Sequence, residues 1–177
     1  MLSERLRYIP IDYKNWVLGP SAKEGVNIKR LGLLDSLELA VWENAVPYQD
    51  QRDDPGQAEM VAYFALKLLE YLPGNRKITV PAAILHDIGL AGIVTEEFRK
   101  AIEGGPESER NLRIKHQESG VERAKEILGN LNYPEEYRRA IYNIIGDHDT
   151  RFNQHSLDGE VMMDADILWR FTVPHRT

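Results

Sequence analysis

The sequence contains no cysteine among its 177 residues. This absence excludes disulfide bonds, zinc sites built from thiolates and a thiol nucleophile. A bound metal ion would therefore need His, Asp, Glu or backbone oxygen as ligands. The chain also has no run of about 18 apolar residues that could span a bilayer. Its first residues include an early acid, Glu4, and no apolar segment of the kind a signal peptide needs. We expect a cytoplasmic protein with no membrane partner.

Positive charge is scarce as well. Lys and Arg number 22 whereas Asp and Glu number 28, which gives a net charge of −6 at neutral pH. A surface of that sign is poorly suited to the phosphate backbone, so we expect no nucleic-acid partner. A small anionic substrate remains compatible with this charge, because one bound divalent ion reverses the local field.

No segment alternates apolar and polar residues for long enough to predict a strand. Residues 1–32 lack steady periodicity and are punctuated by Pro10, Gly19 and Pro20, so we predict an irregular N-terminal arm packed on the core. Residues 33–177 are predicted to form one all-α domain, a helical bundle. Apolar spacing predicts helices over residues 33–46, 55–72, 81–88, 95–104, 108–128, 134–146 and about 156–171.

The helix predicted over 81–88 is the shortest and the most apolar. Thr79 can cap it, Pro81 suits its first turn and Gly89 would end it. The longer helix over 108–128 contains Gly120, which weakens a helix by about 1 kcal/mol relative to alanine.

The sequence has only five histidines. Three of them, His86, His116 and His148, fall on the apolar faces of different predicted helices, close to helix ends. Each is therefore directed inward, where it can meet the other two. A lone histidine on an apolar face is more often an ordinary core residue than a ligand. His155 and His175 fall in loop-like and terminal segments and are predicted to lie at the surface.

Carboxylates near these histidines favour a functional interpretation. Some stand directly beside a histidine and others lie within an apolar helix: Asp87, Asp147, Asp149, Asp164 and Asp166. Burying an unpaired carboxylate is very costly, whereas a buried charge is tolerated when it is paired or bound to a metal. His and Asp converging from several helices, without Cys, are typical ligands of Fe, Mn, Mg or Zn.

Residues 80–89 read VPAAILHDIG and resemble the signature of the HD-domain superfamily of metal-dependent phosphohydrolases. The His-Asp dipeptide alone is common, but the order of the later residues is more specific. Family members with two metal ions carry an early His, then His-Asp, a His, another His and a late Asp. The matching positions here are His86, Asp87, His116, His148 and Asp166. An apolar residue follows the family's late Asp at the second position, and Leu168 therefore selects Asp166 over Asp164.

The resemblance covers about residues 33–171 and implies a helical bundle with the site in its middle. It implies that Asp87 bridges two divalent ions and is the main catalytic residue. His86 and Asp166 would hold one ion, and His116 and His148 the other. A water activated between the ions would then attack phosphorus in a small phosphorylated substrate.

One position departs from the family pattern. The early His is expected near the start of the helix that precedes the His-Asp pair. Counting back along the apolar stripe from Val61 gives Gln57 at that position. Glutamine offers a neutral oxygen and is a poorer ligand than imidazole for transition metals. We therefore expect weak or lost metal binding by Gln57, with its side chain still facing the site.

Several cations lie close to the candidate ligands in the sequence. Arg113, Lys115 and Arg151 are candidates for substrate binding, although solvated helix-surface charge is the more common role of such residues. Arg170 is placed to pair with Asp166 or Asp164. Residues 88–92, directly after the His-Asp pair, contain no ionisable group, so this turn supplies no acid or base.

Two other functional classes stay open at this point. Family members with the same ligand order use two irons and dioxygen to oxidise a substrate, and iron retention with oxygen uptake would identify that chemistry. A degenerate HD domain would bind a ligand without catalysis, and Gln57 is the residue that favours this alternative. The few residues after Val173 leave the pocket either open on one side or closed by a second subunit of a homodimer.

Overall fold

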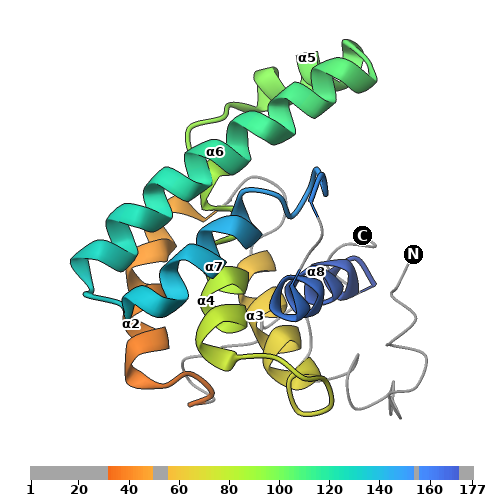
Figure 1. The fold of residues 1–177 in the computed structure, drawn as a ribbon. Helices are drawn as coiled ribbons and strands as arrows, with labels where there is room; N and C mark the ends of the chain where they lie inside the picture. The colour runs from red at the N-terminus through yellow and green to blue at the C-terminus, as the bar shows by residue number, and fades with distance from the viewer. Residues whose placement is uncertain (1–31, 50–55, 154–155, 172–177) are drawn as a thin grey trace.

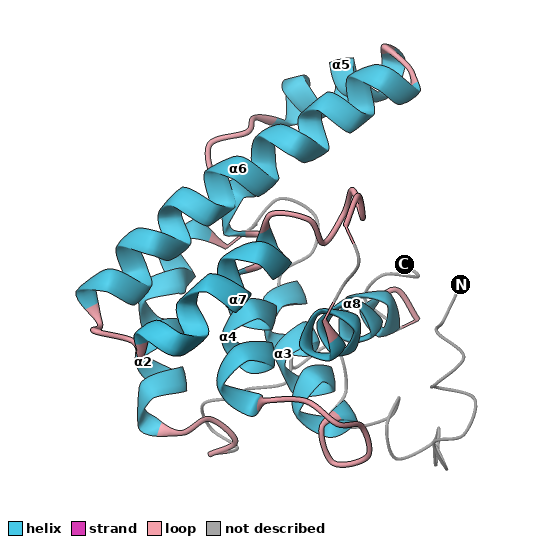
Figure 2. Ribbon diagram, viewed as in Figure 1, coloured by secondary structure: helices cyan, strands magenta, loops and turns pink. Residues whose placement is uncertain are grey.

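A computed structural model of the chain describes residues 32–49, 56–153 and 156–171. Almost all of the predicted N-terminal arm lies outside these residues, as do His155 and His175. The described residues form seven α-helices and no strand, which confirms the all-α class (Figures 1 and 2). The helices are α2 (Ser36–Ala45), α3 (Gln57–Leu68), α4 (Arg76–Leu85), α5 (Thr95–Glu103), α6 (Pro106–Asn130), α7 (Glu135–Ile145) and α8 (Leu157–Trp169).

Helix α4 is the centre of the bundle. It packs against α2, α3, α7 and α8, and every residue from Thr79 to Leu85 is buried. The long helix α6 runs diagonally across the bundle, and α5 lies along one end of it (Figure 1). Two short 3-10 helices, η2 (Val46–Tyr48) and η3 (Ile88–Leu90), link the elements, and η3 packs against α6.

The predicted bounds of α4 were wrong at both ends. The helix begins at Arg76, where the side chain of Asn75 caps it by accepting from the Lys77 amide, and it ends at Leu85, before Gly89. Pro81 therefore lies inside the helix, where it removes the amide that would bond to the Lys77 carbonyl. The hydroxyl of Tyr133 donates to that carbonyl at 2.7 Å instead. This hydrogen bond supplies the missing donor and lets the helix continue through proline.

Helix α5 is attached to the rest of the protein through a small apolar cluster of its own. Ile93, Ala101 and Leu112 are buried there, with Leu90 and Phe98 packed against them. The main core is a separate and much larger cluster formed by the other helices. Helix α5 packs chiefly on α6, and therefore extends from the bundle along α6 (Figure 1).

Among the described residues, no single helix is both long enough and apolar enough to cross a membrane. One bent pair, Arg76–Leu90 with Thr95–Glu103, meets the length and composition requirement only jointly, across an 86° bend. The first member of this pair contains α4, whose residues are mostly buried inside the bundle.

Candidate metal centre

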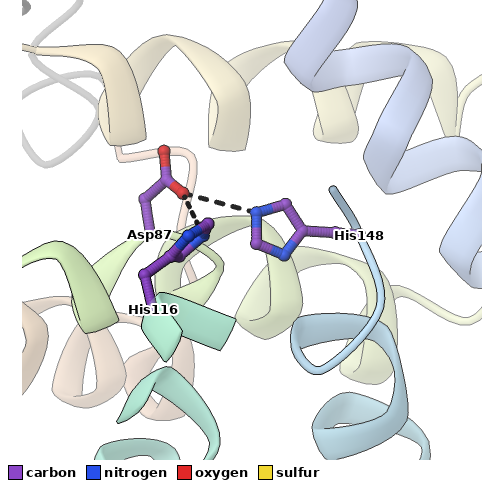
Figure 3. Close-up of side chains that lie close together, drawn as sticks. All are labelled: Asp87, His116 and His148. Carbon is purple, nitrogen blue, oxygen red and sulfur yellow. Dashed lines mark ion pairs between the residues drawn. The ribbon is translucent and has the colours of Figure 1, made fainter. Parts of the chain in front are cut away.

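Four helices bring the predicted ligand residues together. His86 is the C-terminal cap of α4 and Asp87 follows it, while His116 lies in the middle of α6. His148 follows the end of α7, and Asp166 projects from α8. All five lie within one connected cluster, in which ring nitrogens stand 3.2–3.6 Å from carboxylate oxygens. Figure 3 shows the carboxylate of Asp87 directed at the rings of His116 and His148.

The two oxygens of Asp87 face different groups. Oδ1 lies 3.5 Å from Nε2 of His116 and 3.3 Å from Nε2 of His148. Oδ2 lies 3.2 Å from Nε2 of His86 and accepts a hydrogen bond from the Gln57 amide at 3.0 Å. Nε2 of His86 is also 3.6 Å from Oδ1 of Asp166. This division matches the two ligand groups that the family resemblance implies.

Two of the imidazole rings are oriented by backbone carbonyls. Nδ1 of His86 is 2.8 Å from the Ala83 oxygen, and Nδ1 of His148 is 2.8 Å from the Ile145 oxygen. A proton on Nδ1 satisfies each carbonyl and leaves Nε2 of each ring free to accept. The Nε2 atoms of His86 and His116 are buried and make no hydrogen bond within the described residues. Buried polar atoms without partners indicate a group that the protein alone does not supply.

The charges of the cluster are strongly coupled. Burial alone would lower the pKa of His86, but the adjacent Asp87 and the nearby Asp166 outweigh it and raise this pKa well above its usual value. Burial opposes ionisation of Asp87 too, yet the surrounding imidazoles hold its pKa well below the usual range. Burial would also lower the pKa of His148, but the Asp87 carboxylate outweighs it and raises this pKa. The site is thus built to hold positive charge between carboxylates.

A divalent cation fits this donor set. Asp87, His116 and His148 each offer one ligand atom, and these three atoms lie within 4.8 Å of one another. Nitrogen and carboxylate donors without sulfur suit Fe, Mn or Zn. Since a cation replaces the protons that the rings otherwise carry, its charge also satisfies the buried carboxylates.

Two glycines allow the His-Asp segment to lie against α6. A Cβ on Gly89 would stand 1.8 Å from the carbonyl oxygen of His116 and 2.6 Å from the amide nitrogen of Gly120. The backbones of η3 and α6 therefore meet with no space for a side chain at Gly89. Gly120, which only weakens a helix when considered locally, forms the other half of this contact. The close approach places Asp87 beside His116.

The loop after α7 is held by two buried polar side chains. Asp147 accepts hydrogen bonds from the amides of Phe152 and Asn153 at 2.8 and 2.9 Å. Gln117, which is 2% exposed, accepts from the amides of Asp149 and Thr150 at 2.9 and 3.1 Å. Because Gln117 follows His116 on α6, it ties the loop that carries His148 to the helix that carries His116.

Asp149 belongs to the cluster, although its place in the sequence suggested no role beyond flanking His148. Its Oδ2 lies 3.6 Å from Nε2 of His116 and 3.9 Å from Nε2 of His148. The signal available in the sequence was the second acid of the Asp147-His148-Asp149 run. That run does not reveal which of the two acids has its side chain directed into the site.

The HD-domain family model matches residues 58–170, which include His86, Asp87, His116, His148 and Asp166. This match covers more than half of the chain. The chain belongs to the HD-domain family. Searches of curated proteins and of solved structures found no match to it. HD domains are commonly metal-dependent hydrolases, so the family and the candidate cluster together indicate a hydrolase-type function that depends on a divalent metal.

The side chain of Gln57 in this HD domain faces the cavity, as the apolar stripe that includes Val61 predicts. Gln57 is the first residue of α3, after Gly56 with a φ of +92°, and it lines the same cavity as Asp87 and Asp166. Its Nε2 donates to Oδ2 of Asp87. An amide nitrogen that donates in this way cannot ligate a metal ion. The side chain therefore faces the site as predicted, and weak or lost metal binding by Gln57 stays a prediction.

The HD-domain cluster opens into a cavity of about 290 Å³. Two arginines line it: Arg113, which pairs with Glu109 at 2.5 Å and approaches Asp149 at 3.6 Å, and Arg170, which is 3.5 Å from Asp166. The other two cations proposed for substrate binding are not part of this lining. Lys115 pairs with Glu97 of α5, and Arg151 is exposed in the loop after α7.

Proposed function

We propose that this HD-domain protein is a metal-dependent phosphohydrolase that acts on a small phosphate ester. The observation that carries the proposal is the carboxylate of Asp87, whose two oxygens face two separate groups of side chains at one end of an accessible cavity. His86 and Asp166 would share one ion with Asp87, and His116 and His148 would share the other. Asp149 would add a carboxylate to the second group.

The reaction forms a bond from a water oxygen to phosphorus and breaks the ester P–O bond. The alcohol leaves with a proton, and inorganic phosphate remains. When bound, divalent ions lower the pKa of water and neutralise phosphate charge. The chain itself contributes orientation, because the Ala83 and Ile145 carbonyls fix the rings of His86 and His148. It also contributes Arg113 and Arg170 at the cavity, whose planar guanidinium groups suit phosphate oxygens.

The test combines metal analysis with hydrolysis. Purified protein is analysed for bound metal and then assayed on a phosphomonoester and a phosphodiester after loading with Mn²⁺, Mg²⁺, Zn²⁺ or Fe²⁺. His116→Gln should lose both bound metal and hydrolysis. Glu122→Gln, an exposed change on the same helix, should keep both. Retained iron together with oxygen uptake, and no ester hydrolysis with any metal, would overturn the proposal in favour of the oxygenase alternative.

A second candidate function is ligand binding without catalysis, and one contact favours it. The Gln57 amide occupies Oδ2 of Asp87, on the side where His86 and Asp166 lie. An HD domain that has lost this half of its site would hold one ion at most.

Gln57→His separates a lost site from a weakened one. A void of about 20 Å³ beside Gln57 and Asp87 gives the imidazole ring space. If the first half of the site is only weakened, the variant should raise metal content and hydrolysis together. Gln57→Leu, which removes the amide without adding a ligand, is the matched control and should raise neither. Higher metal content in Gln57→His without any hydrolysis would favour the binding function.

A further inference from the structure

The polar and the apolar residues that line the cavity come from different structural elements. The charged residues and the candidate ligands come chiefly from the bundle side of α6, from the loop after α7 and from α8. The apolar lining is gathered on α5 and the segments against which it packs: Leu90, Phe98, Ala101, Ile102 and Leu112. Among the described residues of this apolar wall, no side chain carries a hydroxyl, an amide or a charge.

We propose that the substrate is a phosphate monoester whose alcohol part is a small apolar group, alkyl or aryl. This inference rests on the phosphohydrolase function proposed above, and it names the substrate class of the same site. The phosphate would lie at the Asp87 cluster, and the organic group would lie against the apolar wall of α5.

The lack of polar side chains on the apolar wall argues against a sugar or a nucleoside as the alcohol part of the substrate. Sites that select hydroxyl-bearing substrates supply donors and acceptors for those hydroxyls, because a buried hydroxyl without a partner is costly. None of the described polar residues that line this cavity belongs to α5. Gln57, Arg113 and Arg170 contact the carboxylates of the ligand cluster, and Glu109 of α6 is paired with Arg113. An alcohol part that reaches the α5 wall therefore meets only carbon.

Cavity size and charge favour a single phosphate. At about 290 Å³ the cavity is at the small end of the usual range for ligand sites, enough for a phosphate and one small organic group. Four carboxylates and two guanidinium groups line it, so the lining has an excess of two negative charges when its imidazoles are neutral, as they are when they bind a metal ion. Two divalent ions would add four positive charges and leave the lining with an excess of two. That excess would balance the two negative charges of a phosphomonoester dianion. A polyphosphate would exceed that balance and would need more space.

Ile102 gives the wall a residue that can be changed without disturbing the core. Its side chain lines the cavity and is 68% exposed on a helix that is otherwise rich in charge. Val94, at the start of the same helix, is 62% exposed and is not among the cavity-lining residues. The two positions form a matched pair, in which only Ile102 is expected to touch the ligand.

The first measurement uses phosphonates, which cannot be hydrolysed at the P–C bond. Binding of methylphosphonate, butylphosphonate and 3-hydroxypropylphosphonate to Mn²⁺-loaded protein is measured by calorimetry. The last two have the same length and differ by a hydroxyl in place of a methyl group. Each buried methylene is expected to tighten binding by up to about fourfold. Butylphosphonate should therefore bind at least about tenfold more tightly than the other two.

The second measurement repeats the series on the variants. Ile102→Asn should reduce the preference for butylphosphonate over methylphosphonate by about threefold or more, because it puts an amide into the apolar wall. Val94→Asn should leave the preference unchanged. Neither substitution changes charge, so binding of the phosphonate group itself should be similar in all three proteins.

The outcomes separate this inference from the proposed function. Equal affinities for the three phosphonates, or an equal effect of the two variants, would overturn the apolar-alcohol class even if esters are hydrolysed. The predicted order of binding, with no hydrolysis of phenyl or butyl phosphate under any metal, would remove the hydrolase function and keep the ligand class. Faster hydrolysis of ribose 5-phosphate than of butyl phosphate would also overturn the apolar-alcohol class.

Discussion

The bundle around α4 and the α5 extension are built differently and contribute different things to the site. Helix α4 packs against four other helices and is buried through most of its length, whereas α5 packs chiefly on α6. The His-Asp pair and Asp166 come from elements of the large core, while the apolar wall of the cavity comes from the small cluster at α5. The candidate ligands are thus held by many contacts, and the surface that would meet the organic part of a substrate is held by few. We expect changes next to the ligands in the bundle to damage the metal centre and changes to α5 to spare it.

Gly89→Ala should have the largest effect on the metal centre. The new Cβ would collide with the His116 carbonyl and force η3 away from α6. Because both partners are backbone, relaxation is limited, and we expect a loss of about 3 kcal/mol or more of folding stability together with loss of bound metal. Chemical denaturation and elemental analysis measure the two effects. Gly129→Ala is the control and should be neutral or slightly stabilising, because the added methyl group would meet no neighbouring atom within 4 Å.

Gln117→Leu should weaken metal binding with a smaller effect on folding. The substitution removes the acceptor for the amides of Asp149 and Thr150, which frees the loop that carries His148. Loss of such an orienting partner typically reduces metal affinity by about 10–100-fold. Calorimetric titration with Zn²⁺ or Mn²⁺ measures the change. Glu118→Leu, on an exposed position one residue further, should leave affinity unchanged, and an equal loss in both variants would contradict the assigned role of Gln117.

Tyr133→Phe should lower stability and leave metal affinity nearly intact. The Lys77 carbonyl would lose the hydroxyl that replaces the amide removed by Pro81. Because this hydrogen bond is only partly buried, we expect its loss to cost about 1 kcal/mol, the low end of the range for an acceptor left without a partner. Thermal unfolding with and without metal separates this loss from a change at the site. Tyr142→Phe, at a half-buried tyrosine, should cost less than about 0.5 kcal/mol.

Lys100→Pro should have the smallest effect on the metal centre. Proline in the middle of α5 breaks that helix at a cost of about 3 kcal/mol, but the loss stays local because α5 packs chiefly on α6. We expect unchanged metal content and faster hydrogen exchange confined to α5 and the adjoining part of α6. Loss of metal from this variant would show that the two regions form one cooperative unit. Lys100→Ala is the control and should change neither readout.

Much of the site could be predicted from the sequence because helical periodicity and motif order are local properties. The stripe from Val61 placed Gln57 toward the cavity, and the spacing to Leu168 selected Asp166, whose carboxylate does lie near His86. The pairing of Arg170 with Asp166 also follows from their separation by one helical turn. Metal binding by these residues stays a prediction, which metal analysis of the purified protein tests.

The sequence by itself determined the all-α class, the order of the helices and the inward direction of His86, His116 and His148, because each depends on residue spacing within one helix. Only the tertiary structure decided where α4 begins, that Asp149 joins the cluster and that Lys115 pairs with Glu97 instead of lining the cavity. These outcomes depend on contacts between distant segments. The Tyr133 hydroxyl lies 56 residues from the carbonyl it satisfies, and Gln117 holds amides more than 30 residues away. No local pattern encodes such a partner, because the free energy that decides it exists only once the helices have packed.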